Sequence, residues 1–172
     1  MLRALLTLSL IVALPLWAAE PRELTWSEML PADAAPAAPP AALHDLSKLA
    51  DALAAESGPA ASQQSVAAPV VKALDGQQVK LPGYIVPLDV TEEGRVIEFL
   101  LVPYYGACIH VPPPPPNQIV HVKTELGVLM DNLYQPFWVE GPLRVENTST
   151  EIAETGYQMD ASKIYPYESA DN

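Results

Sequence analysis

The hydrophobic residues from position 70 onward fall in short runs separated by turn residues, a pattern typical of β-strands. The segment 70–81 predicts two strands around an Asp75–Gly76 turn, because glycine accepts the positive φ angle of a tight reversal. The second strand continues past Pro82 and Pro87. Because proline donates no backbone hydrogen bond, we expect this strand to lie at a sheet edge or to contain bulges.

Four further segments complete the predicted sheet. Residues 95–102 are apolar on both faces over much of their length, which favours a central strand. Residues 117–122 predict a fourth strand, and residues 156–167 a last strand with a short closing segment. Residues 136–145 alternate, with a bend or bulge at Gly141. The side chains that share one face of this strand are Phe137, Val139, Leu143 and Val145.

These five or six short strands, spread over about 100 residues, predict a mainly β fold. The uneven strand lengths and the glycine and proline interruptions favour a small barrel of the oligonucleotide/oligosaccharide-binding (OB) type. An immunoglobulin-like sandwich is less consistent with the sequence, because the Cys–Trp–Cys pattern of a true immunoglobulin domain is absent. The fold by itself assigns no function.

The residues before the β region divide into a leader and a linker-like segment. Residues 1–19 combine one positive charge, Arg3, with an apolar run that ends in small residues, the layout of a secretory signal peptide. The run is shorter than the roughly 20 apolar residues of a membrane helix, so we expect no stable membrane insertion. We therefore expect a periplasmic protein with an N-terminal helical and linker region at 20–69, a β-barrel domain at 70–168 and a tail at 169–172.

Two short helices are predicted within the N-terminal region. Thr25 and Glu28 have the spacing of a capping box, and Trp26 lies on the apolar face of the helix that would follow. We expect this helix to dock its tryptophan onto the β domain. A second helix is predicted at 43–57, where leucines recur at steps of three and four, after an alanine- and proline-rich linker at 32–42.

The charge balance excludes one large class of partner. The chain has 9 Lys and Arg against 21 Asp and Glu, a formal net charge of −12. Removing Arg3 with the signal peptide leaves 8 against 21, or −13. Proteins bind nucleic acid by neutralising phosphates with Lys and Arg, so we expect no nucleic-acid partner. Most acidic surfaces do no more than keep a protein soluble.

The candidate chemistry is concentrated in the segment YYGACIHVPPPPPNQ, which contains the only cysteine of the chain. A single cysteine makes no intrachain disulfide, so in an oxidising compartment it is buried, metal-bound, reactive or paired with another chain. Cys108 and His110 point to one face if this segment is extended. Pro112–Pro116 should form a stiff polyproline II rod. His121 joins the same neighbourhood if the chain doubles back after the rod.

Four interpretations of this segment remain open. In the first, Cys108 is a packed apolar residue. In the second, Cys108 and His110 are zinc ligands, and the shell is completed by His121, a carboxylate or water. In the third, His110 activates Cys108 as a nucleophile and Asn117 or His121 orients the imidazole. However, positions i and i+2 of a strand lie roughly 6–7 Å apart, beyond hydrogen-bond reach. In the fourth, the proline rod docks into an aromatic groove of a partner.

Several segments together resemble a family of secreted bacterial domains of unknown function. They are LPGYIVPL, FLLVPYYGACIHVPPPPPNQIV, VEGPLRV and GYQMDA, and the likeness covers residues 70–167. The hallmark is the segment with Cys108, His110, the prolines and Asn117. The resemblance implies no assigned activity, but it implies genomic proximity to components of metal-uptake ABC importers, zinc importers in particular.

We therefore expect a periplasmic accessory protein that assists transition-metal acquisition, with zinc as the possible cofactor. Cys108 and His110 would be ligands, with His121 as a possible third, and the partner would be a metal ABC importer or another envelope protein. The alternative is an interaction module without a metal site or enzymatic activity, which docks through the polyproline loop. A thiol enzyme is the third hypothesis.

Overall fold

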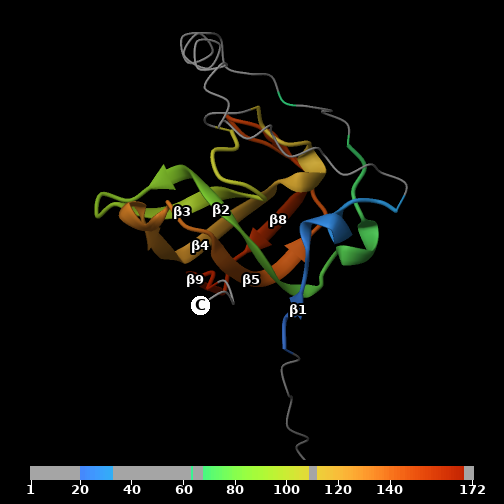
Figure 1. The fold of residues 1–172 in the computed structure, drawn as a ribbon, viewed down its shortest axis with the longest axis horizontal. Coiled ribbons are helices and arrows are strands. Elements are labelled where there is room, and N and C mark those ends of the chain that lie inside the picture. The colour runs from blue at the N-terminus through green and yellow to red at the C-terminus, as the bar shows by residue number, and fades with distance from the viewer. Residues whose placement is uncertain (1–19, 33–62, 64–67, 109–111, 169–172) are drawn as a thin grey trace, which may run out of the picture.

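The computed structural model describes residues 20–32, 63, 68–108 and 112–168, and these residues form a mainly β fold, as predicted (Figure 1). Four single turns of 3-10 helix accompany the strands in these ranges: η1 (Trp26–Met29), η3 (Lys72–Leu74), η4 (Pro116–Gln118) and η5 (Met130–Asn132). The strands are β1 (Arg22–Glu23), β2 (Gln78–Val90), β3 (Arg95–Val102), β4 (Val120–Leu129), β5 (Phe137–Arg144), β6 (Thr148–Ser149), β7 (Glu154–Thr155), β8 (Tyr157–Asp160) and β9 (Lys163–Pro166).

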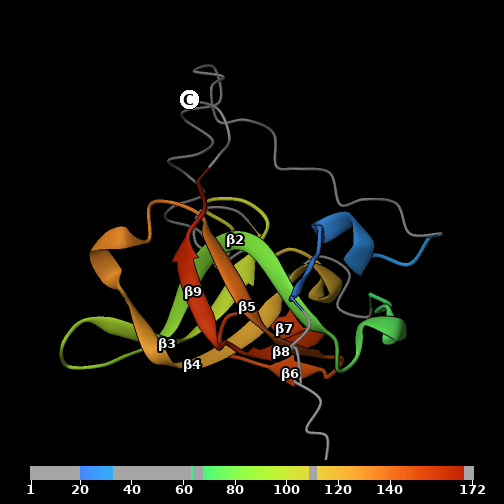
Figure 2. The ribbon, with the colours of Figure 1, turned by 90° about the horizontal axis from the view of Figure 1, so that it is seen from below.

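The main sheet closes on itself through its longest strand. Its order is β1-β2-β3-β4-β8-β5-β9, and β2 also pairs with β5, so that β2, β3, β4, β8 and β5 form a ring (Figure 2). The first half of β2 pairs with β5 and the second half with β3. This sheet has seven strands among the described residues, one more than the larger number predicted, and β6 and β7 form a separate hairpin.

Strand alternation fills the interior of the ring. The main core cluster takes inward-facing residues from β2, β3, β4, β5 and β8, including Leu81, Phe99, Val122, Val139 and Tyr157. The predicted common face of β5 is confirmed for Phe137, Val139 and Leu143, which are all buried in this cluster.

A second, smaller apolar cluster covers the outer face of β3. It contains Val86, Leu100, Val102, Ala107, Ile119 and Ala153, with Cys108 packed against it. This outer cluster explains why residues 95–102 are apolar on both sides. One face of β3 fills the ring, and the other lies under the loop that carries Cys108.

The prolines of β2 lie where the predicted bulges and open edges are. The pairing between β2 and β3 shifts register between Pro87 and Asp89. At Pro82, β2 pairs with β5 on one side only, because its pairing with β3 begins at Tyr84. A strand that continues past both prolines is therefore compatible with their missing donors.

The strand predicted before the Asp75–Gly76 turn is wrong, although the turn itself is present. Gly76 has φ +75°, as the tight reversal requires. The residues before it form η3, because the backbone N–H of Val71 donates to the Tyr157 hydroxyl at 2.8 Å instead of to a neighbouring strand. The predicted closing segment is also a strand, β9, which pairs with β5.

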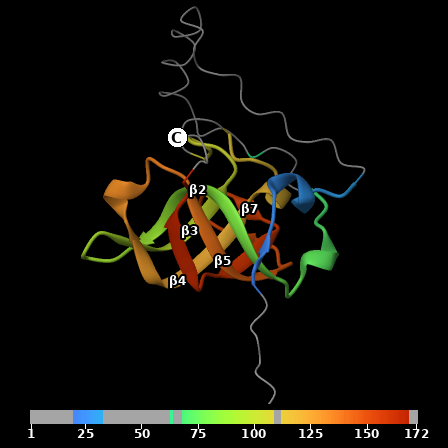
Figure 3. The ribbon, with the colours of Figure 1, turned by 60° about the horizontal axis from the view of Figure 1, so that its bottom comes forward.

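The N-terminal segment is built into the sheet domain. Thr25 and Glu28 form the predicted capping box, and Trp26 Nε1 donates to the carbonyl oxygen of Pro82 at 2.6 Å. The turn they start is a four-residue 3-10 helix, so the structure gives no support for an α-helix here. Strand β1 runs parallel to β2 (Figure 3), and Met29 is fully buried in the main core.

Other expectations concern parts of the chain outside the described residues. The signal peptide at 1–19, the helix at 43–57 and most of the linker lie there. Within the described ranges, no helix is long and apolar enough to cross a membrane.

Candidate functional site

His121 is the predicted ligand whose surroundings the structure defines most fully. It lies on β4, opposite Leu100 of β3, and two residues after Ile119. Because cross-strand partners and i, i+2 neighbours share a face, His121 lies on the same outer face of the ring as the outer cluster. Its side chain is 5% exposed.

One ring nitrogen of His121 has an acidic partner on the adjacent strand. Nε2 lies 2.7 Å from Oε1 of Glu98. An ionised carboxylate only accepts, so Nε2 carries the hydrogen, and in the neutral imidazole Nδ1 then holds the free lone pair. Nδ1 is buried and has no hydrogen-bond partner in the part of the chain that the structure describes.

Cys108 lies against the outer cluster in a strained backbone conformation. Its φ is +65°, and it is the only non-glycine residue with positive φ among those described. Such conformations concentrate at functional sites. Burial raises the pKa of the Cys108 thiol to about 11. The thiol is therefore almost entirely protonated at neutral pH, which opposes the thiol-enzyme interpretation unless something else removes the proton.

Two tyrosines, Tyr104 and Tyr105, precede the cysteine in the segment after β3. Tyr104 packs on the outer cluster, and burial, followed by the charge of Cys108, raises the pKa of its phenol. Tyr105 is exposed and meets Tyr84 edge-on, with ring centroids 5.7 Å apart. The thiol is thus largely desolvated, and Tyr104 packs on the same outer cluster as Cys108.

The structure describes two of the three predicted ligands. Cys108 packs against the outer cluster, and His121 lies on the same outer face of the ring, but Nδ1 of His121 makes no hydrogen bond to the thiol. His110 lies outside the described residues. Within the described part of the chain, no group of three His, Cys, Asp or Glu side chains is arranged to hold a metal ion. A complete zinc shell therefore needs His110 or a further donor.

The proline segment is packed into the domain and not exposed as a free rod. Pro113, Pro114 and Pro116 are buried. The amide of Asn117 donates to the carbonyl oxygen of Pro69 at 2.8 Å, and the amide of Gln118 donates to that of Trp26 at 3.0 Å. Side-chain amides therefore fix both N-terminal segments to the end of the proline run.

Gln63 was not predicted to have a role, yet its amide joins three chain segments. Nε2 donates to the carbonyl oxygens of Pro114 at 2.9 Å and Glu154 at 2.8 Å. Oε1 accepts from the backbone N–H of Glu154 at 2.8 Å. One linker residue thus connects the proline run to β7, and it lies 51 residues before Pro114 and 91 residues before Glu154.

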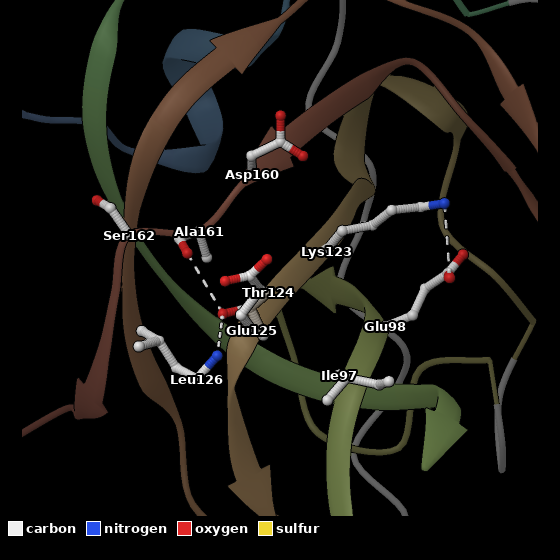
Figure 4. Close-up of a pocket in the computed structure, with 9 residues that line it drawn as sticks. All are labelled: Ile97, Glu98, Lys123, Thr124, Glu125, Leu126, Asp160, Ala161 and Ser162. Atoms are coloured by element: carbon white, nitrogen blue, oxygen red, sulfur yellow. Dashed lines mark hydrogen bonds and ion pairs between the residues drawn. The ribbon is translucent and has the colours of Figure 1, made fainter. Parts of the chain in front are cut away.

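Glu98 was also missed, and it lies between His121 and an open groove. The groove has a volume of about 570 Å³ and is bordered by β3, β4 and the β8–β9 turn (Figure 4). There Oε2 of Glu98 faces the ammonium group of Lys123 at 3.6 Å. The only sequence signal for Glu98 was an acidic residue within an otherwise apolar strand, which is weak without knowledge of the cross-strand partner.

Fold and site together define a mainly β domain with a part-buried histidine–carboxylate pair on its outer face and a largely desolvated thiol at the outer cluster. The family described as "Protein of unknown function (DUF3299)" matches residues 26–166, and the chain belongs to this family. The chain is also similar to a solved structure, a crystal structure of a DUF3299 family protein from Pseudomonas aeruginosa PAO1. The two are 68% identical, the match covers 87% of this chain and 97% of the other, and the TM-score is 0.75. A comparison with curated proteins gives no match.

Proposed function

We propose that this protein is a periplasmic accessory protein that binds zinc and assists its acquisition. Cys108, His110 and His121 are the protein ligands, and water or a carboxylate completes the shell. The partner in this proposal is a metal ABC importer or another envelope protein that receives the ion. We further interpret the ring of strands as a small OB-like barrel whose outer face carries the site.

The observation that carries this proposal is that Nδ1 of His121 has no hydrogen-bond partner among the described residues. A buried polar atom without a partner is costly, and each case calls for an explanation. Metal-binding histidines commonly donate their second ring N–H to a carboxylate, which leaves the other nitrogen free for the ion. His121 has this arrangement, with Glu98 on Nε2 and, within the described ranges, no hydrogen-bond partner on Nδ1.

The environment of Cys108 favours a metal ligand over a free nucleophile. Burial raises the pKa of its thiol to about 11, so the apo site keeps the proton. A bound zinc ion deprotonates a coordinating thiol outright, because the ion supplies the positive charge that the pocket lacks. A thiol enzyme would need a base in contact with Cys108, and Nδ1 of His121 does not bond to it.

The buried prolines do not favour the alternative of docking through the polyproline loop. An aromatic groove of a partner binds exposed proline rings. Here Pro113, Pro114 and Pro116 are covered by the domain itself. A partner would have to displace the contacts made by Gln63 and Asn117 before it reached them.

Zinc binding by the purified mature protein tests the proposal directly. Equilibrium dialysis at micromolar zinc should give one bound ion per chain. Cys108→Ser, His110→Ala and His121→Gln should each weaken binding at least tenfold, whereas His44→Ala, which removes the remaining histidine, should not. Absence of bound zinc, or equal loss in the His44 variant, would contradict the proposal. A Cys108→Ala variant with full partner binding would support the interaction module instead.

A further inference from the structure

The most informative unassigned residue is Glu98, because its two carboxylate oxygens face different environments. Oε1 accepts from the buried His121, while Oε2 faces Lys123 at the open groove. The Glu98 side chain is 31% exposed, and that of Lys123 is 59% exposed. A carboxylate thus lies directly behind the His121 ring, which we propose as a metal ligand.

We propose that Glu98 is a positioning residue that holds His121 with Nδ1 toward the ion, and that its charge makes the site select divalent over monovalent cations. This inference deepens the proposed function and rests on it for the selectivity. The positioning part concerns the protein without metal. The selectivity part names the ligand class as a divalent, borderline-soft ion such as Zn²⁺, in preference to the soft monovalent Cu⁺.

The positioning argument follows from the ring contacts. Among the described residues, the Glu98 carboxylate is the sole hydrogen-bond partner of the His121 ring. The hydrogen bond made by one ring nitrogen determines which nitrogen can bind a metal, because the nitrogen that carries the hydrogen has no free lone pair. Without Glu98, neither the tautomer nor the ring orientation would be fixed. The β-strand register supports this, because Glu98 pairs with Lys123, two residues from His121 on the same face.

The selectivity argument follows from Coulomb's law. The interaction of a fixed negative charge with a cation is proportional to the charge of the cation. The Glu98 carboxylate therefore contributes about twice as much free energy to Zn²⁺ as to Cu⁺ at the same position. Lys123 offsets only part of this charge, because it lies 3.6 Å away and is mostly in water, which screens the pair.

A matched pair of variants separates the contact from the charge. Glu98→Gln keeps the shape of the side chain and removes its charge. Glu125→Gln removes an equal charge from the exposed side of the same groove, without a contact to His121. Affinities for Zn²⁺ and Cu⁺ would be measured by competition with chromophoric chelators, after circular dichroism has shown that each variant is folded.

Glu98→Gln should lower the Zn²⁺ affinity by about 10- to 100-fold, the range for removing such a partner of a ligand. The Cu⁺ affinity should fall by a smaller factor, because the charge part of the lost free energy is about half as large for a monovalent ion. Glu125→Gln should change neither affinity by more than about twofold, as expected for an exposed charge. Equal losses for the two ions, or an equal effect of Glu125→Gln, would overturn the charge selectivity.

Lys123→Gln supplies a second test that does not depend on the stability of Glu98→Gln. Removing the ammonium group leaves the Glu98 charge less compensated, so Zn²⁺ affinity should rise by about two- to fivefold, the range for an exposed pair. A fall in affinity would contradict the role assigned to the Glu98 charge.

The tautomer of His121 is measured by ¹⁵N nuclear magnetic resonance of the imidazole ring in the metal-free protein. We expect the hydrogen on Nε2 in the unaltered protein and a mixture of tautomers in Glu98→Gln. A hydrogen on Nδ1 in the unaltered protein would overturn the positioning role. If the unaltered protein binds no zinc, the proposed function and the selectivity fail together, but the ring spectrum still decides whether Glu98 positions His121.

Discussion

The amide of Gln63 offers a test of how the linker holds the loop that bears Cys108. Gln63→Ala removes two donated hydrogen bonds, to Pro114 and Glu154, and one accepted from the Glu154 N–H. A hydrogen bond contributes about 0.5–1.5 kcal/mol net, so three lost bonds set a range of about 1.5–4.5 kcal/mol. Gln63 is only partly buried, so water replaces some of these bonds. We expect a loss of about 2 kcal/mol in the free energy of unfolding.

Urea denaturation followed by circular dichroism measures this loss. With an m value of about 2 kcal/mol per molar urea, the midpoint should fall by about 1 M. Gln63→Glu should be destabilised as well, because a carboxylate has no hydrogen to donate to either carbonyl oxygen. Gln64→Ala is the matched control, since it removes the same side chain one position later. A midpoint shift below about 0.2 M for Gln63→Ala, or an equal shift for Gln64→Ala, would refute the reasoning.

Three further predictions follow from local contacts. A methyl group at Gly141 would lie 2.5 Å from a backbone oxygen of β8, so Gly141→Ala should cost at least about 1–3 kcal/mol, which thermal denaturation would show. Burial raises the pKa of Cys108 to about 11, so below that pH the thiol stays protonated. At pH 7, iodoacetamide should therefore alkylate Cys108 about 20-fold more slowly than free cysteine. Rapid alkylation would contradict the burial and favour a thiol enzyme. The buried Tyr157 hydroxyl accepts from the Val71 N–H and donates to the carbonyl oxygen of Met29. Tyr157→Phe should therefore lower the free energy of unfolding by about 1–3 kcal/mol. An unchanged urea midpoint would argue against these bonds.

Local patterns predicted the elements that depend on neighbouring residues. The turn at Gly76, the Thr25–Glu28 capping box and the central strand at 95–102 all appear in the structure. The strand before the turn was predicted wrongly, because the hydroxyl of Tyr157, 86 residues away, takes the backbone N–H of Val71. An apolar run alone gives no sign of such a distant partner.

The candidate site was predicted only in part. The sequence singled out Cys108 and His121, and the pairing of β3 with β4 places His121 on the face that the Cys108 loop covers. Glu98 and Gln63 were missed because a lone acidic residue in a strand and a glutamine in a linker carry no motif. Their roles depend on partners 23 and 91 residues away.

The sequence by itself determined the class of fold and the segment that holds the candidate chemistry. Strand alternation, turn residues and the cysteine–histidine–proline run are local features, and short-range sterics and hydrogen bonding fix their meaning. Only the tertiary structure decided that three of the five prolines are buried and that β2 closes the ring. It also decided that His121 has a carboxylate on one nitrogen and, in the part of the chain that the structure describes, no partner on the other. These outcomes depend on strand register and loop packing, which pair residues far apart in the chain, and a shift of one residue would have turned His121 into the core.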